Sequence, residues 1–387
     1  YAQTEGNINL NAFGNLTDIK VTAGKNISLT TDTGDIMVNG DVDAGNDISV
    51  TTATGDIMMS GDVRAENDVK VTNANGDTEL RGKVSTGNDI LISSETGAVL
   101  AYDTVAAGSD LTVTSESGMI GLGGDTDAGR DIAAISQTGT IMLLGDIDAG
   151  QDVKAKTGGD GSIMLNNPIA IIFDEQTGDV HAGRNVTLET ENTGLLVAGE
   201  VTTETGDVIA ATKKGIIEFV GNVEAGRNIE ATITEGDDSS YIQYMGTTVA
   251  GNDITATTNQ GDIKYVKSVS AGNSVTALTD NGNIVYDATV TAGDSVLADT
   301  LAGNITVGED IVAQQGNVTL TTAAGSVIVG ENDGTGNIRA GSDVSITTEK
   351  GDAAVKTSVA SDSGSVSVKS LQGNINVGEV EVENAIS

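Results

Sequence analysis

Residues 44–57 read Ala-Gly-Asn-Asp-Ile-Ser-Val-Thr-Thr-Ala-Thr-Gly-Asp-Ile, and the opening Ala-Gly-x-Asp/Asn-Ile/Val returns every 21 residues along much of the chain. Units as short as this cannot each bury an apolar face alone, so they must stack on one another. The period therefore predicts a stack of about 17 coils, which start near Ala2, Ala23, Ala44, Ala65, Thr86, Ala107, Ala128, Ala149, Ala182, Glu204, Ala225, Ala250, Ala271, Ala292, Gln314, Ala340 and Asp362.

Within each unit the pattern is that of short strands separated by corners. A glycine such as Gly34, Gly55 or Gly76 stands eleven residues after most unit starts, and this recurrence predicts a corner with positive φ. Between corners apolar residues alternate with polar ones, as at Ile48 and Val50 and again at Ile57 and Met59. Each unit is therefore predicted to form three short strands, each paired with its equivalent 21 residues further on.

The predicted fold class is all-β, a single parallel β-solenoid (β-helix) that runs without interruption over residues 1–387. Three breaks in the period predict insertions near residues 158–173, 237–241 and 331–337. With three Phe, six Tyr and no Trp in 387 residues, the core must consist mainly of aliphatic side chains.

Composition also excludes several classes of partner. The formal net charge is −37, which opposes binding to nucleic acid or to anionic lipid. No apolar run is long enough for a membrane helix, so no membrane insertion is expected. The chain contains no Cys, and disulfides are therefore excluded.

Carboxylates recur at the fourth position of the unit. In a stack they would lie about 5 Å apart and repel one another by roughly 1 kcal/mol per pair in water. Backbone N–H groups could offset this by donating hydrogen bonds to each side chain, which would also explain Asn and Ser elsewhere in the column. Alternatively, Ca²⁺ could bridge neighbouring coils, as a possible cofactor in a fold that requires none. The candidate calcium ligands are Asp47, Asp68, Asp89, Asp110, Asp131 and Asp152.

Other acidic and aromatic side chains gather elsewhere in the sequence. A shorter acidic set, Asp35, Asp56 and Asp77 with Asp41 and Asp62, makes weak cation binding reasonable in the N-terminal coils. The first two insertions follow the same corner three coils apart, and they are predicted to border one surface patch. The candidate ligand-binding residues of this patch are Asp160, Asp174, Glu175, Asp237, Asp238, Tyr241 and Tyr244.

The sequence does not favour an enzyme. Paired carboxylates in the patch could serve as acid and base for polysaccharide cleavage. However, the chain has a single His, His181, and its serines form no recognisable nucleophile constellation. We therefore expect no catalysis, and a carbohydrate-binding or polysaccharide-cleaving module remains the alternative.

The repeats of residues 44–57, with variants at 107–120 and 250–263, resemble those of filamentous-haemagglutinin-like exoproteins of the two-partner-secretion type. The resemblance covers essentially the whole chain, and it implies an extracellular, cell-surface β-helical shaft used in adhesion or biofilm structure. Neither end of the sequence shows a cap that would cover terminal strands. The expected partner is therefore self, head to tail or laterally, or further coils of a longer chain, with glycans as possible ligands.

Overall fold

The computed structural model describes residues 2–166, 178–331 and 336–383, and these form an all-β parallel β-solenoid of about 17 turns of about 21 residues. The fold class predicted from the repeat is thus confirmed. The chain forms two compact units, one of residues 1–192 with 197–199 and the other of residues 193–196 with 200–387. We call them unit 1 and unit 2 and describe each by itself. The uninterrupted solenoid over residues 1–387 stays a prediction.

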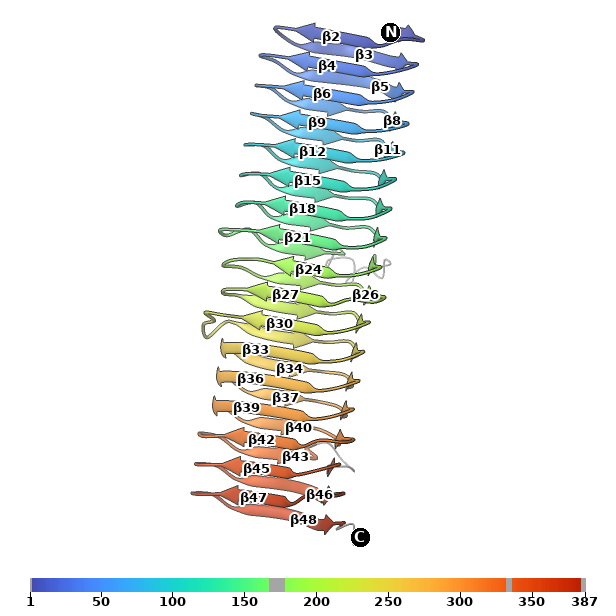
Figure 1. The fold of residues 1–387 in the computed structure, drawn as a ribbon. Coiled ribbons are helices and arrows are strands. Elements are labelled where there is room, and N and C mark those ends of the chain that lie inside the picture. The colour runs from blue at the N-terminus through green and yellow to red at the C-terminus, as the bar shows by residue number, and fades with distance from the viewer. Residues whose placement is uncertain (1, 167–177, 332–335, 384–387) are drawn as a thin grey trace. The chain divides into compact units, whose positions relative to one another are not determined.

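A coil of unit 1 contains three strands that bound a narrow interior. In the coil that starts at Ala44 these are β6 (Ile48–Thr52), β7 (Ile57–Met59) and β8 (Val63–Ala65). We call the three columns of such strands the long face, the first short face and the second short face. The corner before each long strand is the first corner, and the corner after it is the glycine corner. Figure 1 shows the long strands following one another within each unit.

In unit 1 the strands of each column are parallel. The long face contains β2 (Ile8–Ala12), β4 (Ile27–Thr31), β6, β9 (Val69–Asn73), β12 (Ile90–Ser94), β15 (Leu111–Ser115), β18 (Ile132–Ser136), β21 (Val153–Thr157) and β24 (Val186–Glu189). The first short face contains β7, β10 (Thr78–Leu80), β13 (Val99–Ala101), β16 (Ile120–Leu122), β19 (Ile141–Leu143) and β22 (Ile163–Leu165). The second contains β1 (Ala2–Thr4), β8, β11 (Val84–Thr86), β14 (Val105–Ala107), β17 (Thr126–Ala128), β20 (Ile147–Ala149) and β23 (Val180–Ala182). Two longer strands run through both short faces, β3 (Leu16–Ala23) and β5 (Ile36–Ala44).

Unit 2 repeats this plan, and the chain passes into it around β25 (Leu195–Val197). The long face contains β27 (Val208–Thr212), β30 (Ile229–Ile233), β33 (Ile254–Gln260), β36 (Val275–Asn281), β39 (Val296–Ala302), β42 (Val318–Thr322), β45 (Val344–Thr348) and β47 (Val366–Ser370). The first short face contains β28 (Ile216–Phe219), β31 (Tyr241–Tyr244), β34 (Asp262–Tyr265), β37 (Ile284–Tyr286), β40 (Ile305–Val307) and β43 (Val327–Val329). The second contains β26 (Val201–Thr203), β29 (Val223–Ala225), β32 (Thr248–Ala250), β35 (Val269–Ala271), β38 (Val290–Ala292), β41 (Ile311–Ala313) and β44 (Asn337–Ala340), and both faces share β46 (Ala353–Ser361) and β48 (Ile375–Val382).

The register follows the sequence period, and alternation sets which side chains enter the core. Ile48 of β6 pairs with Val69 of β9, one period later, and the rest of the strand keeps this offset. Ile48, Val50 and Ile57 are at most 1% exposed, while Ser49 and Thr51 between them face outward and are half-buried. Each coil thus buries its apolar side chains only together with its neighbours, as a stack requires.

The glycine corners correct one prediction. Positive φ is found at Gly34, Gly55, Gly76, Gly215 and Gly261, and the prediction is wrong for the other glycines of the column. Close approach of the preceding coil is the more general reason for glycine. A Cβ at Gly118 would lie 2.0 Å from the carbonyl oxygen of Gly97, so any side chain there would force the backbones apart.

Candidate functional site

The six aspartates of the predicted calcium column lie half-buried at first corners of unit 1. Most of them accept a hydrogen bond from the backbone one coil further on. The N–H of Asp89 donates to Oδ1 of Asp68, and the N–H of Asp110 donates to Oδ1 of Asp89, both at 3.1 Å. Asp131 N–H bonds Asp110 at 3.4 Å, and Asp152 N–H bonds Asp131 at 3.1 Å. The column is therefore a staircase in which most carboxylates accept a hydrogen bond from a backbone N–H of the next coil.

A second donor comes from the side chain just before the aspartate of the next coil. Nδ2 of Asn67 donates to Asp47 at 2.6 Å, and Nδ2 of Asn88 donates to Asp68 at 2.8 Å. An arginine at the same position pairs with the carboxylate through two nitrogens. Nε of Arg130 lies 2.9 Å from Oδ1 of Asp110, and the terminal nitrogen Nη2 bonds Oδ2.

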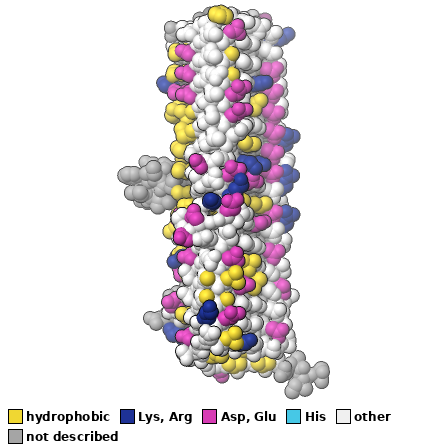
Figure 2. Space-filling model, turned by 90° about the vertical axis from the view of Figure 1, so that its left-hand side faces the viewer, with side chains coloured by type: hydrophobic (Ala, Val, Ile, Leu, Met, Phe, Trp, Pro, Cys, Tyr) yellow, Lys and Arg dark blue, Asp and Glu magenta, His cyan; other side chains and the backbone are white. Residues whose placement is uncertain are grey.

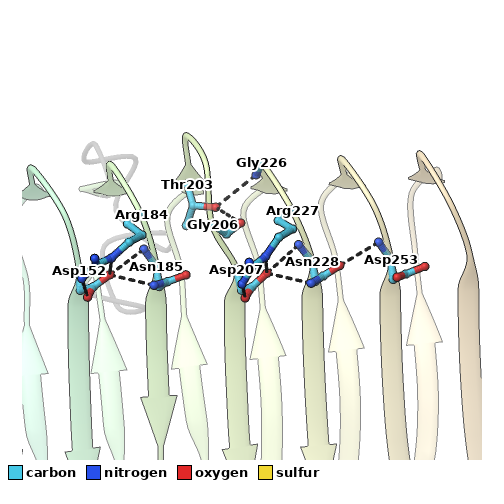
Figure 3. A network of polar contacts seen from close by, with 10 residues as sticks. All are labelled: Asp152, Arg184, Asn185, Thr203, Gly206, Asp207, Gly226, Arg227, Asn228 and Asp253. Carbon is cyan, nitrogen blue, oxygen red and sulfur yellow. Dashed lines mark hydrogen bonds and ion pairs between the residues drawn. The ribbon is translucent and has the colours of Figure 1, made fainter.

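Asp152 shows the fullest version of this arrangement (Figure 3). Its Oδ1 accepts from Nε of Arg184 at 2.8 Å, from the N–H of Asn185 at 3.1 Å and from Nδ2 of Asn185 at 2.9 Å. The hydrogen bond from Arg184 holds the pKa of Asp152 below its usual range, although burial acts in the opposite direction. The hydrogen bond from Arg130 lowers the pKa of Asp110 in the same way.

Unit 2 contains the same cluster at its own first corners. Oδ1 of Asp207 accepts from Nε of Arg227 at 2.8 Å and from the N–H and Nδ2 of Asn228, each at 3.0 Å (Figure 3). Asn228 in turn accepts from the N–H of Asp253 at 3.2 Å, so an amide performs the same role as a carboxylate. The pKa of Asp207 is lowered, mainly by the hydrogen bond from Arg227.

These contacts give the first-corner carboxylates protein donors that offset their mutual repulsion. Within residues 2–166, 178–331 and 336–383, no group of three His, Cys, Asp or Glu side chains is placed to hold a metal ion. The calcium site stays a prediction. The second acidic set follows the staircase pattern, since Asp35 accepts from the N–H of Asp56 at 2.9 Å and Asp41 from that of Asp62 at 3.2 Å.

The residues of the predicted ligand patch are distributed over both units. Asp160 is exposed in unit 1, whereas Asp237, Asp238 and Tyr241 lie in unit 2. Asp174 and Glu175 fall outside the described residues, as does much of the insertion near 158–173 and part of that near 331–337. The patch shared between two insertions stays a prediction.

The insertion near 237–241 is a tight loop between β30 and β31, built around Asp237. Its carboxylate accepts from the N–H of Ser239 at 2.9 Å, from the hydroxyl of Ser239 at 2.6 Å and from that of Ser240 at 3.2 Å. The hydrogen bond from the Ser239 side chain is the main cause of a lowered pKa for Asp237. The carboxylate of Asp237 is therefore used to hold the loop in shape. Asp238 is the acidic side chain of the loop that lines the adjacent groove.

A groove of about 440 Å³ opens beside this loop, over the first short face of unit 2. Nε2 of Gln260 bonds Asp238 across it, and Nζ of Lys264 lies 2.9 Å from Oδ2 of Asp287. The Tyr241 hydroxyl donates to Oε2 of Glu218 at 3.0 Å. The groove is lined by one aromatic ring, several amides and a few charges, among them Asp238, Tyr241, Gln243, Gln260, Lys264 and Asn281. It therefore offers hydrogen-bonding groups and a flat ring to a ligand.

Tyr244 does not belong to this surface, and its assignment to the patch was wrong. Its side chain is 1% exposed and stacks between Phe219 and Tyr265, with ring centroids 5.2 Å and 4.9 Å away. Tyr286 extends the stack at 5.1 Å from Tyr265. The cause is strand parity, because Tyr244 lies two residues after the inward-facing Ile242 in β31.

Three hydroxyl groups of this aromatic ladder are buried without a hydrogen-bond partner among the described residues, those of Tyr244, Tyr265 and Tyr286. Burial raises the pKa of all three phenols. An unpaired buried hydroxyl costs stability, so the ladder must be held by the packing of its rings.

A second ladder that the sequence analysis missed is polar and buried. Ser115, at the end of its long strand, donates to the carbonyl of Gly97 at 3.1 Å and accepts from the N–H of Gly118 at 2.8 Å. Thr157 bonds the carbonyl of Gly139 at 2.7 Å. The signal was available, because Ser, Thr or Asn stands three residues before most corner glycines.

Searches among protein-family models, curated proteins and solved structures found no match for this chain. The repeat architecture is therefore established by the fold itself, while membership of the filamentous-haemagglutinin-like group stays a prediction. Within the part of the chain that the structure describes, no helix has the length and apolar character needed to cross a membrane.

Proposed function

We propose that this chain is a structural extracellular protein, a segment or subunit of a cell-surface fibre whose coils continue from one copy, or one stretch of chain, to the next. The support is the apolar surface at the β47–β48 end of unit 2. Side chains at core positions are exposed there, whereas their equivalents one coil earlier are buried.

The contrast follows the strand register. Ile375, Val380 and Val382 of β48 are 51%, 55% and 42% exposed. Their pairing partners in β46, Ala353, Val359 and Ser361, are at most 1% exposed. Exposed apolar surface of this kind marks an interaction site, and a further coil would cover it with the same side-chain ladder that covers β46. That coil would come from a second copy or from a further stretch of the same chain.

Electron microscopy of the isolated protein tests this proposal. We expect fibres with an axial repeat near one subunit length, and Ile375→Asp should shorten or abolish them because a buried charge would face the next coil. Ser367→Asp is the matched control, since Ser367 faces outward on β47 in the same coil and should leave the fibres intact. Uniform short particles of the unaltered protein at all concentrations would contradict stacking between copies.

Carbohydrate binding is a second candidate, favoured by the groove beside Tyr241. Planar amides and an aromatic ring are suited to hydroxyl-rich ligands. Glycan-array binding that is lost in Gln243→Ala and Lys264→Ala would support it. Thr306→Ala provides the control, because Thr306 occupies the outward position of β40 beyond the groove. Binding without release of reducing ends would agree with the expectation that the protein is not an enzyme.

A further inference from the structure

A column of apolar side chains runs along the first short face of unit 1, where each short strand has one outward-facing residue. Register pairs Met37 with Met58, Leu100 with Gly121, and Met142 with Met164. All are only half-buried in the structure. Figure 2 shows apolar side chains gathered along the left edge of the upper coils. We call this column the methionine stripe; in coil order it consists of Met37, Met58, Glu79, Leu100, Gly121, Met142 and Met164.

The stripe is nearly free of uncompensated charge on a chain whose net charge is −37. Its only charged member, Glu79, is paired with Arg81 at 2.9 Å. The second short face of the same unit differs, since Asp127 and Asp148 lie side by side there. Partial burial, followed by repulsion from Asp148, raises the pKa of Asp127. Two copies of so acidic a chain therefore repel each other less at the methionine stripe than at the second short face.

The apolar side chains of the stripe are arranged symmetrically about its central residue, so they occur in the same order from either end. Leu100 lies at the centre, with Met58 and Met142 two coils away on either side. Met37 and Met164 lie three coils away. The one mismatch is complementary, because Glu79 lies one coil before the centre and Gly121 one coil after it. A large side chain would therefore meet a position without a side chain.

From this symmetry we infer that the methionine stripe binds the same stripe of a second copy, in an antiparallel pair related by a two-fold axis at Leu100. This inference rests on the self-association part of the proposed function, but it concerns a lateral surface. An isologous contact of this kind needs a self-complementary patch, which the stripe provides. Methionine side chains adapt readily to one another across such a contact.

The flanking charges favour the antiparallel order. In that order Asp77 lies opposite Met119, Asp56 opposite Thr140 and Asp35 opposite Ser162, so no two of these carboxylates face each other. At the centre Tyr102, which is 55% exposed, meets Tyr102 of the second copy. A parallel pair would instead place Glu79 against Glu79, where like charges repel.

The size of the stripe sets the strength of the contact. Six coil spacings of about 4.8 Å give a length of roughly 29 Å, and one strand position gives a width of about 10 Å. The area of about 300 Å² per copy is below that of stable dimers, so a weak and transient pair is expected. Aligned fibres that repeat the stripe many times would gain strength by avidity.

Single-cysteine variants test the inference directly, because the chain has no Cys. Under mild oxidation with diamide, Leu100→Cys should form a disulfide-linked dimer at least tenfold faster than Ser93→Cys, which faces outward on β12 in the same coil. Met58→Cys alone should cross-link poorly. Mixed with Met142→Cys, it should give the heterodimer.

Other outcomes are equally informative. Equal cross-linking of Leu100→Cys and Ser93→Cys would overturn the inference, and rapid homodimers of Met58→Cys would overturn the antiparallel order. Adding Met142→Glu to Leu100→Cys should slow cross-linking, whereas adding Ile375→Asp should not. If Ile375→Asp abolishes fibres while Leu100→Cys still cross-links, the lateral pair forms independently of end-to-end stacking. If fibres form but Leu100→Cys does not cross-link, end-to-end stacking is supported and pairing through the methionine stripe is contradicted.

Discussion

At the scale of single residues, an aspartate at a first corner acts as an acceptor for the next coil. Asp152 accepts from the backbone of Asn185 and from the side chains of Asn185 and Arg184. Asn228 accepts the same backbone bond in unit 2 without carrying a charge. The required property of the column is therefore an oxygen at Oδ1, and the negative charge is secondary.

Substitutions at Asp152 should separate these two properties. We expect Asp152→Ala to lower the free energy of unfolding by about 1 kcal/mol or more, because a backbone donor loses its partner. Asp152→Asn keeps Oδ1 and loses only the exposed ion pair, which is worth at most about 1 kcal/mol, so its cost should be smaller. Urea unfolding at pH 7 measures both, and equal costs would contradict the acceptor role.

The pH dependence of Asp152 has a definite sign. Its pKa is lower in the folded state than the ordinary value of about 3.9, so its contribution is complete above that pH and is lost as the pH falls through the folded pKa. The difference in stability between the unaltered protein and Asp152→Asn should therefore shrink below about pH 4.

Asp299 should behave in the opposite way. Burial, with help from Asp280, raises its pKa, so the ionised form costs stability above the folded pKa and costs nothing below the unfolded one. Asp299→Asn should raise the thermal midpoint at pH 7 and have no effect on it near pH 3. The corresponding gain in the free energy of unfolding at pH 7 should be less than about 1 kcal/mol. Asp253→Asn is the control and should bring no gain, because Asp253 already accepts from Asn273 and Ser274.

At the scale of elements, the aromatic ladder shows that large side chains on one strand of a coil are matched by small ones on the opposite strand. The coils that contribute Phe219, Tyr244, Tyr265 and Tyr286 have Ala at the middle inward position of the long strand: Ala210, Ala231, Ala256 and Ala277. Several coils of unit 1 have a larger residue there, such as Leu29 and Ile92. A narrow interior thus accommodates large rings where the opposite strand is small.

The same substitution at two tyrosines should have opposite effects. Tyr265→Phe removes a buried hydroxyl without a partner among the described residues and should be neutral or stabilising, by up to about 1–2 kcal/mol. Tyr241→Phe removes a hydrogen bond to Glu218 and should cost about 0.5–1.5 kcal/mol. Chemical unfolding of both variants decides the matter. A loss in Tyr265→Phe would mean that its hydroxyl has a favourable interaction in solution.

Elements were predictable from the sequence wherever the period was intact. Gly45, Asp47 and Ile48 recur at fixed spacing, and alternation then fixes which side chains enter the core. The prediction that Tyr244 lies on the surface failed. The extra residues after Asp237 interrupt the 21-residue period, so the sequence does not show that Tyr244 occupies the same inward-facing strand position as Phe219. The prediction of positive φ also failed for most corner glycines. Glycine is required there because a Cβ would clash with the preceding coil, and the sequence of a single corner does not show how closely two coils approach.

At the scale of the whole molecule, we predict that the stability of the solenoid does not depend on a metal. Every first-corner carboxylate from Asp47 to Asp152 has a protein donor. We expect the thermal midpoint to be the same, within about 1 °C, with EDTA and with added Ca²⁺. A higher midpoint in Ca²⁺, lost in Asp89→Asn and Asp131→Asn, would instead establish calcium as a ligand of the column.

The aromatic ladder of unit 2 also provides an optical reporter. The chain has no Trp, and three of its six Tyr lie in this ladder. Phenol emission is therefore not lost by energy transfer to an indole. In unit 1 the described tyrosine is Tyr102, which is already largely in water. A change in tyrosine fluorescence on heating should consequently report the opening of unit 2, while far-UV circular dichroism follows the strands of both units.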